Sequence, residues 1–206
     1  MTKGLLSRDS ISGDKLGNPY MSNITWTGPI DENSGQMSFT GSSLQQIRQQ
    51  ICEIDPNFSW SRKTELGPQN SLDEDRGNIL CDMAWDPKFA SVFHIRQGIA
   101  YLHKIHGNCT NGPGPGNCAR VSCSYGSGIW FCNDNSHPTS VPCSTFGDRA
   151  WDIIEKCYAF GTQKSPYPFV TCLIDSHFVK DFPTDSVHGQ AFDTAGWNVI
   201  VAGADC

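Results

Sequence analysis

The sequence contains few basic residues and no long apolar run. Lys and Arg total 15 against 21 Asp and Glu, which gives a net charge of −6. This balance leaves no basic stripe of the kind that binds a phosphate backbone, so nucleic acid is not expected as a partner. No stretch approaches the roughly 18 to 20 consecutive apolar residues of a membrane span. We therefore expect a soluble chain.

Short motifs of common catalytic and cofactor sites are also missing. No Cys-x-x-Cys pair indicates a zinc site. The GPGPG run at 112–116 lacks the Gly-Lys-Ser/Thr ending of a phosphate loop, and its prolines remove backbone donors. We expect a rigid surface turn there. Gly126-Ser127-Gly128 has the wrong spacing for an esterase elbow, and no acidic pair stands out as a glycosidase pair.

Histidines offer the one metal-like pattern. His94, His103 and His106 fall in the segment expected to form the second helix, and the last two are three residues apart, so they could hold a metal with a third ligand. Histidines near a helix C-terminus are more often placed there because the helix dipole favours their charge. We expect no metal, no cofactor and no catalytic residue.

Cysteine is abundant instead. Ten cysteines in 206 residues form an even set that favours an oxidised framework over reduced thiols. A Cys–His nucleophile would need an unpaired thiol, which an even set does not supply. We expect all ten to form disulfides: Cys52, Cys81, Cys109, Cys118, Cys123, Cys132, Cys143, Cys157, Cys172 and Cys206.

This framework indicates a secreted, extracellular protein. The first 18 residues contain no apolar signal-peptide core, so we expect any such peptide to have been removed. Glycosylation sequons begin at Asn23, Asn57 and Asn108, which agrees with export. Residues 1–18 are polar and unpatterned and are expected to be a mobile arm. Residues 19–206 are expected to be a single disulfide-rich α+β domain, because the length gives no case for two independent cores, and the protein is expected to be a monomer.

Apolar residues at helical spacing indicate three helices. Their buried stripes are Leu44, Ile47, Ile51 and Ile54 in the first, Val92, Ile95, Ile99 and Leu102 in the second, and Ala150, Ile153 and Cys157 in the third. The expected boundaries are a Ser42–Gln45 capping box and Asp55-Pro56 for the first, Asp86-Pro87 and Gly107 for the second, and Thr145 and Gly161 for the third.

Strands are expected in the remaining segments, and the last ones form hairpins rather than crossovers. They lie within 18–28, 35–41, 78–81, 119–125, 128–133, 169–175, 189–194 and 196–203. The sequence thus predicts an α+β fold: a mainly antiparallel β-sheet with two or three helices packed on one face in a disulfide-stapled sandwich.

The densest stretch, ARVSCSYGSGIWFCNDN at 119–135, is interpreted as a hairpin with a Gly126-Ser127 loop. That loop pairs Cys123 with Trp130 and places Val121, Cys123 and Tyr125 on the face of Trp130 and Cys132. Because the third helix presents Cys157 on its apolar stripe, we expect a Cys123–Cys157 bridge between hairpin and helix. Cys132 is the rival partner for Cys123, and Cys143 is a plausible partner for Cys132.

The same stretch carries a resemblance. Cys118, Arg120, Val121, Cys123, Tyr125, Trp130, Cys132, Asn133, Asp134 and Cys157 fit a pattern found in small cysteine-rich secreted proteins of filamentous fungi, which are candidate effectors. The resemblance covers roughly the C-terminal half. The order of helices and hairpins is distantly similar to the killer toxins encoded by viruses of smut fungi. The long region before Asp86 departs from that topology.

The resemblance implies a non-enzymatic effector or toxin-like protein that binds a host or competitor protein, glycan or channel. The expected recognition surfaces are the loop at 57–77 and the GPGPG turn, since loops on a stapled scaffold can vary freely. The alternative is a secreted hydrolase whose His and Asp side chains converge only in the fold. A concave pocket that holds His103 or His106 beside an aspartate would favour the hydrolase.

Overall fold

A computed structural model describes residues 22–31, 34–60, 76–83, 87–158 and 185–206. Within these residues the chain forms antiparallel sheets, three helices and four disulfides, so the expected disulfide-stapled α+β class is confirmed. The expected arm at 1–18, the strand at 169–175, Asp86, Gly161, Cys172 and most of the loop at 57–77 lie outside the described residues.

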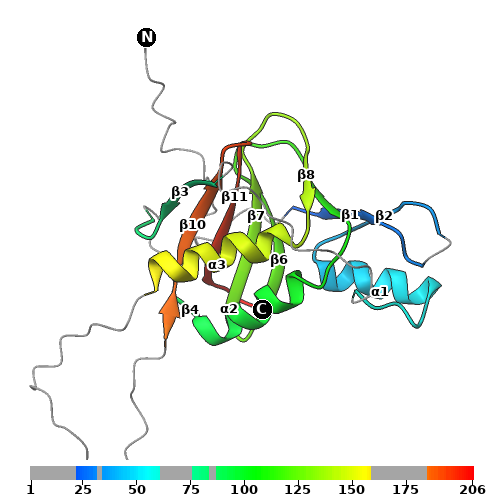
Figure 1. The fold of residues 1–206 in the computed structure, drawn as a ribbon, viewed down its shortest axis with the longest axis horizontal. Coiled ribbons are helices and arrows are strands. Elements are labelled where there is room, and N and C mark those ends of the chain that lie inside the picture. Colours follow the sequence, from blue (N-terminus) through cyan, green and yellow to red (C-terminus); the bar gives the residue numbers. More distant parts are fainter. Residues whose placement is uncertain (1–21, 32–33, 61–75, 84–86, 159–184) are drawn as a thin grey trace, which may run out of the picture.

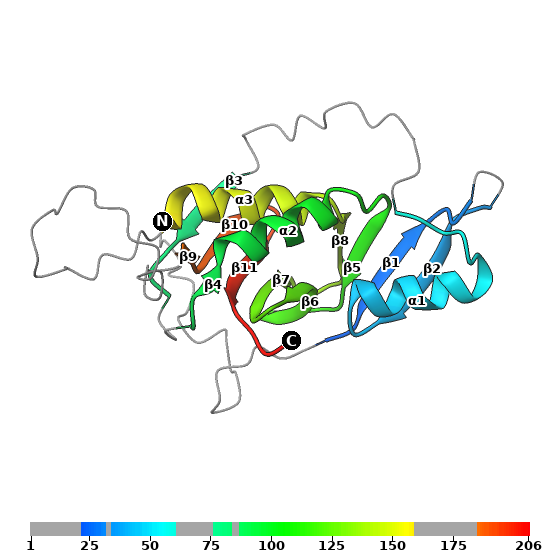
Figure 2. The same ribbon diagram turned by 90° about the horizontal axis from the view of Figure 1, so that it is seen from below.

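The larger sheet has five antiparallel strands in the order β3-β10-β11-β7-β6 (Figure 1). Their bounds are Arg76–Leu80, Gly189–Asp193, Trp197–Gly203, Ser127–Asn133 and Asn117–Ser124. Helices α2, Val92–Leu102, and α3, Thr145–Cys157, cover one face of this sheet (Figure 2). Helix α2 packs on β6 and β7, whereas α3 packs on β10 and β11. Just before α2, the short strand β4, Ala90–Ser91, pairs with β9, Ser186–Val187, from much later in the chain.

A second sheet, which the sequence did not separate from the first, has the order β2-β1-β5-β8. Its strands are Met37–Gly41, Ile24–Gly28, Asn108–Asn111 and Thr139–Pro142. Helix α1, Leu44–Ile54, packs on β2 and β1. The main apolar core runs through both sheets and all three helices without a break. Two sheets therefore share one core.

The helix stripes are largely confirmed, but several boundaries differ. Leu44, Ile47 and Ile51 are buried, whereas Ile54 is exposed. The N-cap of α1 is Ser43, one residue later than expected, because the Ser43 hydroxyl accepts from the Gln46 N–H. Helix α2 begins at Val92 rather than at Pro87, since residues 90–91 pair with β9.

The central hairpin has a different register from the expected one. Its turn residues are Tyr125 and Gly126, which both have positive φ, so Ser124 pairs with Ser127 and Cys123 with Gly128. A bulge at Val121 shifts the register again. Val121 therefore joins the core beneath the helices, while Trp130 and Cys132 belong to a smaller cluster that does not include it. The expected faces were wrong for this reason.

The expected Cys123–Cys157 bridge is wrong. Cys123 bonds Cys206, and Cys157 bonds Cys81, which follows β3. The expectation placed α3 over the β6–β7 hairpin, but α2 occupies that position and α3 lies over β10 and β11. A disulfide between the larger sheet and α3 does exist, but its cysteine on the sheet side is Cys81 rather than Cys123.

The two remaining bridges join strands. Cys118 bonds Cys132 across the β6–β7 pair, and Cys109 of β5 bonds Cys143 just after β8. The alternatives left open for Cys132, a bridge to Cys123 or to Cys143, therefore do not form. Cys52 forms no disulfide with any described cysteine.

Candidate binding surfaces

The three histidines do not converge. Only His94 lies within α2, because the helix ends at Leu102, so the helical spacing expected for His103 and His106 does not apply. His103 Nε2 lies 3.0 Å from Asp148 Oδ1 at the surface. His106 Nδ1 lies 2.8 Å from the Trp60 carbonyl oxygen and is oriented as its donor. The described residues contain no group of three or more His, Cys, Asp or Glu side chains that could hold a metal.

A buried charge network lies between α3 and the larger sheet. Arg149 donates to Asp193 at the end of β10 and pairs with Asp152, which also accepts from Arg76 at 2.9 Å. Burial raises the pKa of Asp152, and the two guanidinium groups offset part of that rise. The Arg149 guanidinium also lies 5.8 Å from the centre of the Trp197 ring. These paired carboxylates hold α3 against the sheet and are not a free acid–base pair.

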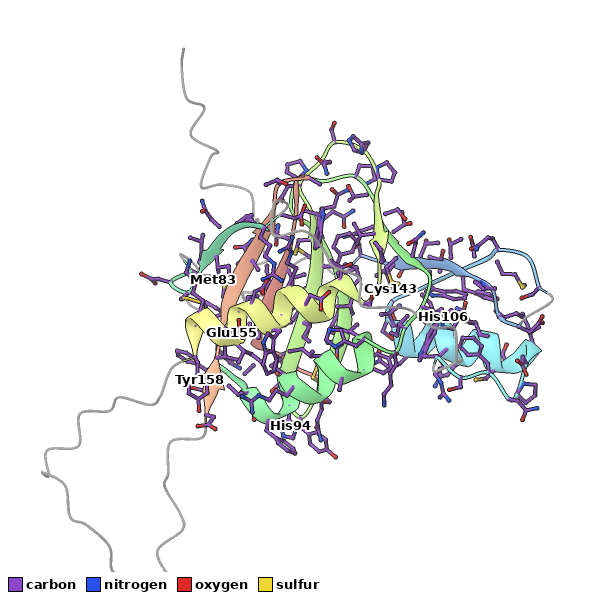
Figure 3. The ribbon with its side chains drawn as sticks, in the orientation of Figure 1. Met83, His94, His106, Cys143, Glu155 and Tyr158 are labelled. Atoms are coloured by element: carbon purple, nitrogen blue, oxygen red, sulfur yellow. A yellow bond between two sulfur atoms is a disulfide. The ribbon has the colours of Figure 1, made fainter. Side chains whose placement is uncertain are left out.

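An exposed aromatic surface is formed by Phe93 and His94 of α2 and by Tyr125 at the hairpin tip. Tyr125 is 82% exposed and Phe93 is 64% exposed. The Tyr125 and His94 rings stack with centroids 4.6 Å apart, and Phe93 meets His94 edge to face at 5.2 Å. His94 lies at the margin of the molecule (Figure 3). We call these three residues the aromatic surface.

The backbone beneath Tyr125 is unusual. Its φ is 47°, in the left-handed region, and the next residue, Gly126, has a φ of 73°. Such a turn matches the twist of a hairpin but normally uses Asn, Asp or Gly at its first position. A bulky residue there costs on the order of 1 to 2 kcal/mol. The fold therefore keeps a strained tyrosine whose ring is almost fully in solvent.

The segment after β11 holds the hairpin tip in place through two contacts. The Cys123–Cys206 bridge ties β6 to the segment after β11, and the Ala204 N–H donates to the Gly126 carbonyl at 3.0 Å. A second ring pair, Phe89 stacked on His188 at 4.0 Å, lies just before β4. Exposed aromatic rings at this end are thus presented on a stapled backbone.

A separate cleft lies between α1, the segment that follows it and the C-terminal end of α2. We call it the α1–α2 cleft. It has a volume of about 380 Å³ and is lined by Gln45, Arg48, Gln49, Ser59, Trp60, Tyr101 and Lys104. Neither His103 nor Asp148 lines it.

Two polar groups in the cleft are enclosed. Trp60 is 5% exposed, and neither its indole Nε1–H nor the Tyr101 hydroxyl forms a hydrogen bond among the described residues. The Trp60 indole and the Arg48 guanidinium each lower the pKa of the Tyr101 phenol, but burial is the larger influence. Burial raises the pKa of Tyr101 to about 12. An unmade hydrogen bond in such a place costs about 1 to 3 kcal/mol.

Sequence reasoning missed the aromatic surface and found only part of the cleft, since Ser59 and Trp60 belong to the loop at 57–77 that was expected to be a recognition surface. It placed Tyr125 inside a strand, and it assigned Trp60 to a polar loop at 57–77, although the Trp60 side chain is part of the core. A tryptophan in an otherwise polar segment was the available signal.

The GPGPG turn packs against the end of β7, where the Gly114 N–H donates to the Asn135 carbonyl at 2.6 Å.

Comparison with known proteins does not extend these observations. No family model matches the chain, and no curated protein or solved structure matches it either. None of the described helices is long and apolar enough to cross a membrane. The three sequon asparagines, Asn23, Asn57 and Asn108, are exposed.

Proposed function

We propose that the chain is a secreted, non-enzymatic effector- or toxin-like protein that binds a target on the surface of a host or competitor cell. The aromatic surface is its binding site. The observation that carries this proposal is Tyr125, a strained and 82% exposed tyrosine at the tip of a stapled hairpin. The resemblance of the C-terminal half to secreted fungal proteins supports the further proposal that the chain comes from a fungus.

Strain at Tyr125 favours a role in recognition. Backbone strain persists where the surrounding structure imposes it, and it concentrates at functional sites. The ring gains stacking on His94 but little burial in return. A turn with a purely structural role would gain stability from Asn or Gly at this position.

The chemistry of the surface fits binding rather than catalysis. Tyrosine and phenylalanine provide a large contact area with few rotatable bonds, and tyrosine is enriched among the residues that dominate binding energy. The Cys123–Cys206 bridge and the α2 backbone fix the rings before binding. Less conformational entropy is then lost when a target binds.

The test compares cell-surface binding of the labelled protein with that of two variants, Tyr125→Asn and Phe93→Ala, across plant, animal and fungal cells. Asparagine tolerates the left-handed backbone, so the first variant removes the ring without disturbing the turn. We expect each variant to bind at least about tenfold more weakly, as expected when a central aromatic contact worth about 1.4 kcal/mol is lost.

Ile54→Ala is the matched control, because Ile54 is also an exposed apolar residue but lies on α1. It should bind as the parent protein does, and all variants should retain the parent far-UV spectrum. Binding to some cell type that is unaffected by both aromatic substitutions would refute the assignment of the site. Absence of binding to every cell type would refute the proposed function.

A secreted hydrolase is the second candidate function, because His103 and Asp148 make the histidine–aspartate contact that could orient a general base. The α1–α2 cleft lies outside this pair. Assay of the parent protein and His103→Ala on ester, glycoside and peptide substrates decides between the candidates. Hydrolysis that disappears in the variant would favour the hydrolase and count against a purely binding role.

A further inference from the structure

We propose that the α1–α2 cleft is a second binding site and that its ligand is a small sugar acid, bound through its carboxylate and hydroxyl groups. This inference is independent of the proposed function, because the cleft and the aromatic surface share no residue. The cleft is lined from α1 and from the C-terminal end of α2, whereas His94, near the start of α2, lies at the margin of the molecule (Figure 3).

The enclosed donors are the first reason to expect a ligand. Buried side-chain donors in folded proteins nearly always have partners, so an exception needs an explanation. The Trp60 N–H can only donate, and Tyr101 stays protonated at physiological pH because burial raises its pKa to about 12. Both groups therefore need an acceptor. Both polar atoms lie beneath the surface of the cleft, so a ligand oxygen accepts from Tyr101 only once the phenol turns toward the cleft, and the phenol oxygen can then accept from Trp60.

Charge is the second reason. Arg48 from α1 and Lys104 from just beyond α2 both line the cleft, and none of its described lining residues is acidic. In a chain with a net charge of −6, the described part of this cleft is therefore positively charged. An arginine can bind a carboxylate through two parallel hydrogen bonds, and a lysine adds a compact positive charge. The ligand should therefore be an anion.

The rest of the lining favours hydroxyl groups over an apolar ligand. Gln45 and Gln49 each present an amide that can donate and accept, and Ser59 adds a hydroxyl. The volume of about 380 Å³ falls at the lower end of the range of small-molecule sites, which suits one or two sugar rings. A carboxylate on a polyhydroxylated ring fits the charge, the amides and the size together.

The experiment titrates the full-length oxidised protein with three probes by calorimetry: sodium D-glucuronate, D-glucose and sodium sulfate. Glucuronate carries both features, whereas glucose lacks the charge and sulfate lacks the ring. We expect glucuronate to bind at least about tenfold more tightly than either of the others. Equal binding of sulfate and glucuronate would overturn the sugar part of the proposal. No binding of glucuronate at about tens of millimolar would overturn it entirely.

Variants then place the binding in the cleft. Arg48→Ala and Lys104→Ala should each weaken glucuronate binding about tenfold or more, and Tyr101→Phe should weaken it through the lost donor. Lys88→Ala is the matched control, since Lys88 is an exposed cation just before β4. Unchanged affinity in both Arg48→Ala and Lys104→Ala would refute the site. Because both residues are exposed, these two variants should fold even where Tyr101→Phe is destabilised.

Discussion

The Cys123–Cys206 bridge should be a major source of stability, because it closes the longest loop among the described disulfides. Its two cysteines are 83 residues apart, whereas Cys118 and Cys132 are 14 apart. The perturbation that tests this is the double substitution Cys123→Ser with Cys206→Ser. Cys206 is exposed, so the change removes a covalent constraint and little packing.

The magnitude of the stabilisation follows from the conformational entropy that a disulfide removes from the unfolded chain, which grows with the length of the closed loop. A closed loop of 83 residues corresponds to about 4.5 kcal/mol at 25 °C, and a loop of 14 residues to about 3 kcal/mol. The other three bridges barely shorten the long loop, since none of them links its two ends. We therefore expect the free energy of unfolding to fall by up to about 4.5 kcal/mol in the double variant.

The assay is urea unfolding of the oxidised proteins, followed by far-UV circular dichroism. The slope of free energy against urea should also increase, because the denatured chain exposes more surface without its longest cross-link. Cys118→Ala with Cys132→Ala is the comparison variant. Both of these cysteines are buried, so its loss of stability includes packing, but its smaller loop should change the slope less.

A fall of less than about 1 kcal/mol in Cys123→Ser with Cys206→Ser would refute this reasoning. So would a slope that increases less in this variant than in the comparison variant. Either result would mean that the bridge does not stabilise the fold by constraining the unfolded chain.

Two further predictions concern ionisable groups. Because burial raises the pKa of Tyr101 to about 12, its contribution to stability is complete below about pH 10 and declines as the pH rises toward 12. In urea unfolding over this pH range, the free energy of unfolding should therefore fall less steeply for Tyr101→Phe than for the parent protein. Identical pH slopes for the two proteins would contradict the prediction. Arg149→Met should destabilise the fold by about 3 to 5 kcal/mol because it leaves the buried Asp193 carboxylate without its cation. Arg76→Met, at a 41% exposed arginine, should cost about 1 kcal/mol or less, and equal losses in the same urea assay would show that burial does not decide the effect.

Local patterns in the sequence were sufficient for most of the elements. Leu44, Ile47 and Ile51 line the buried face of α1 as expected, and the strands of the final hairpin, β10 and β11, pair as expected. These features depend on residues a few positions apart, where periodicity and turn signals act directly. The class of the fold follows from such elements and from the number of cysteines.

Elements that depend on distant partners were not predictable in the same way. Helix α2 starts at Val92 because residues 90–91 pair with β9, almost a hundred positions later in the chain. The hairpin register depends on a left-handed tyrosine and a bulge at Val121, neither of which has a sequence signal. The same bulge decided which side chains face the helices.

The sequence by itself determined an α+β chain with an oxidised framework, three amphipathic helices and antiparallel hairpins, because spacing and composition act over short distances. Tertiary structure alone decided the partners of Cys123 and Cys157, since a disulfide requires two α-carbons within a few ångströms and ten cysteines allow many pairings. It also brought Trp60 beside Tyr101 and Tyr125 against His94. Both candidate surfaces arise where segments far apart in sequence meet, and only packing around the shared core brings those segments together.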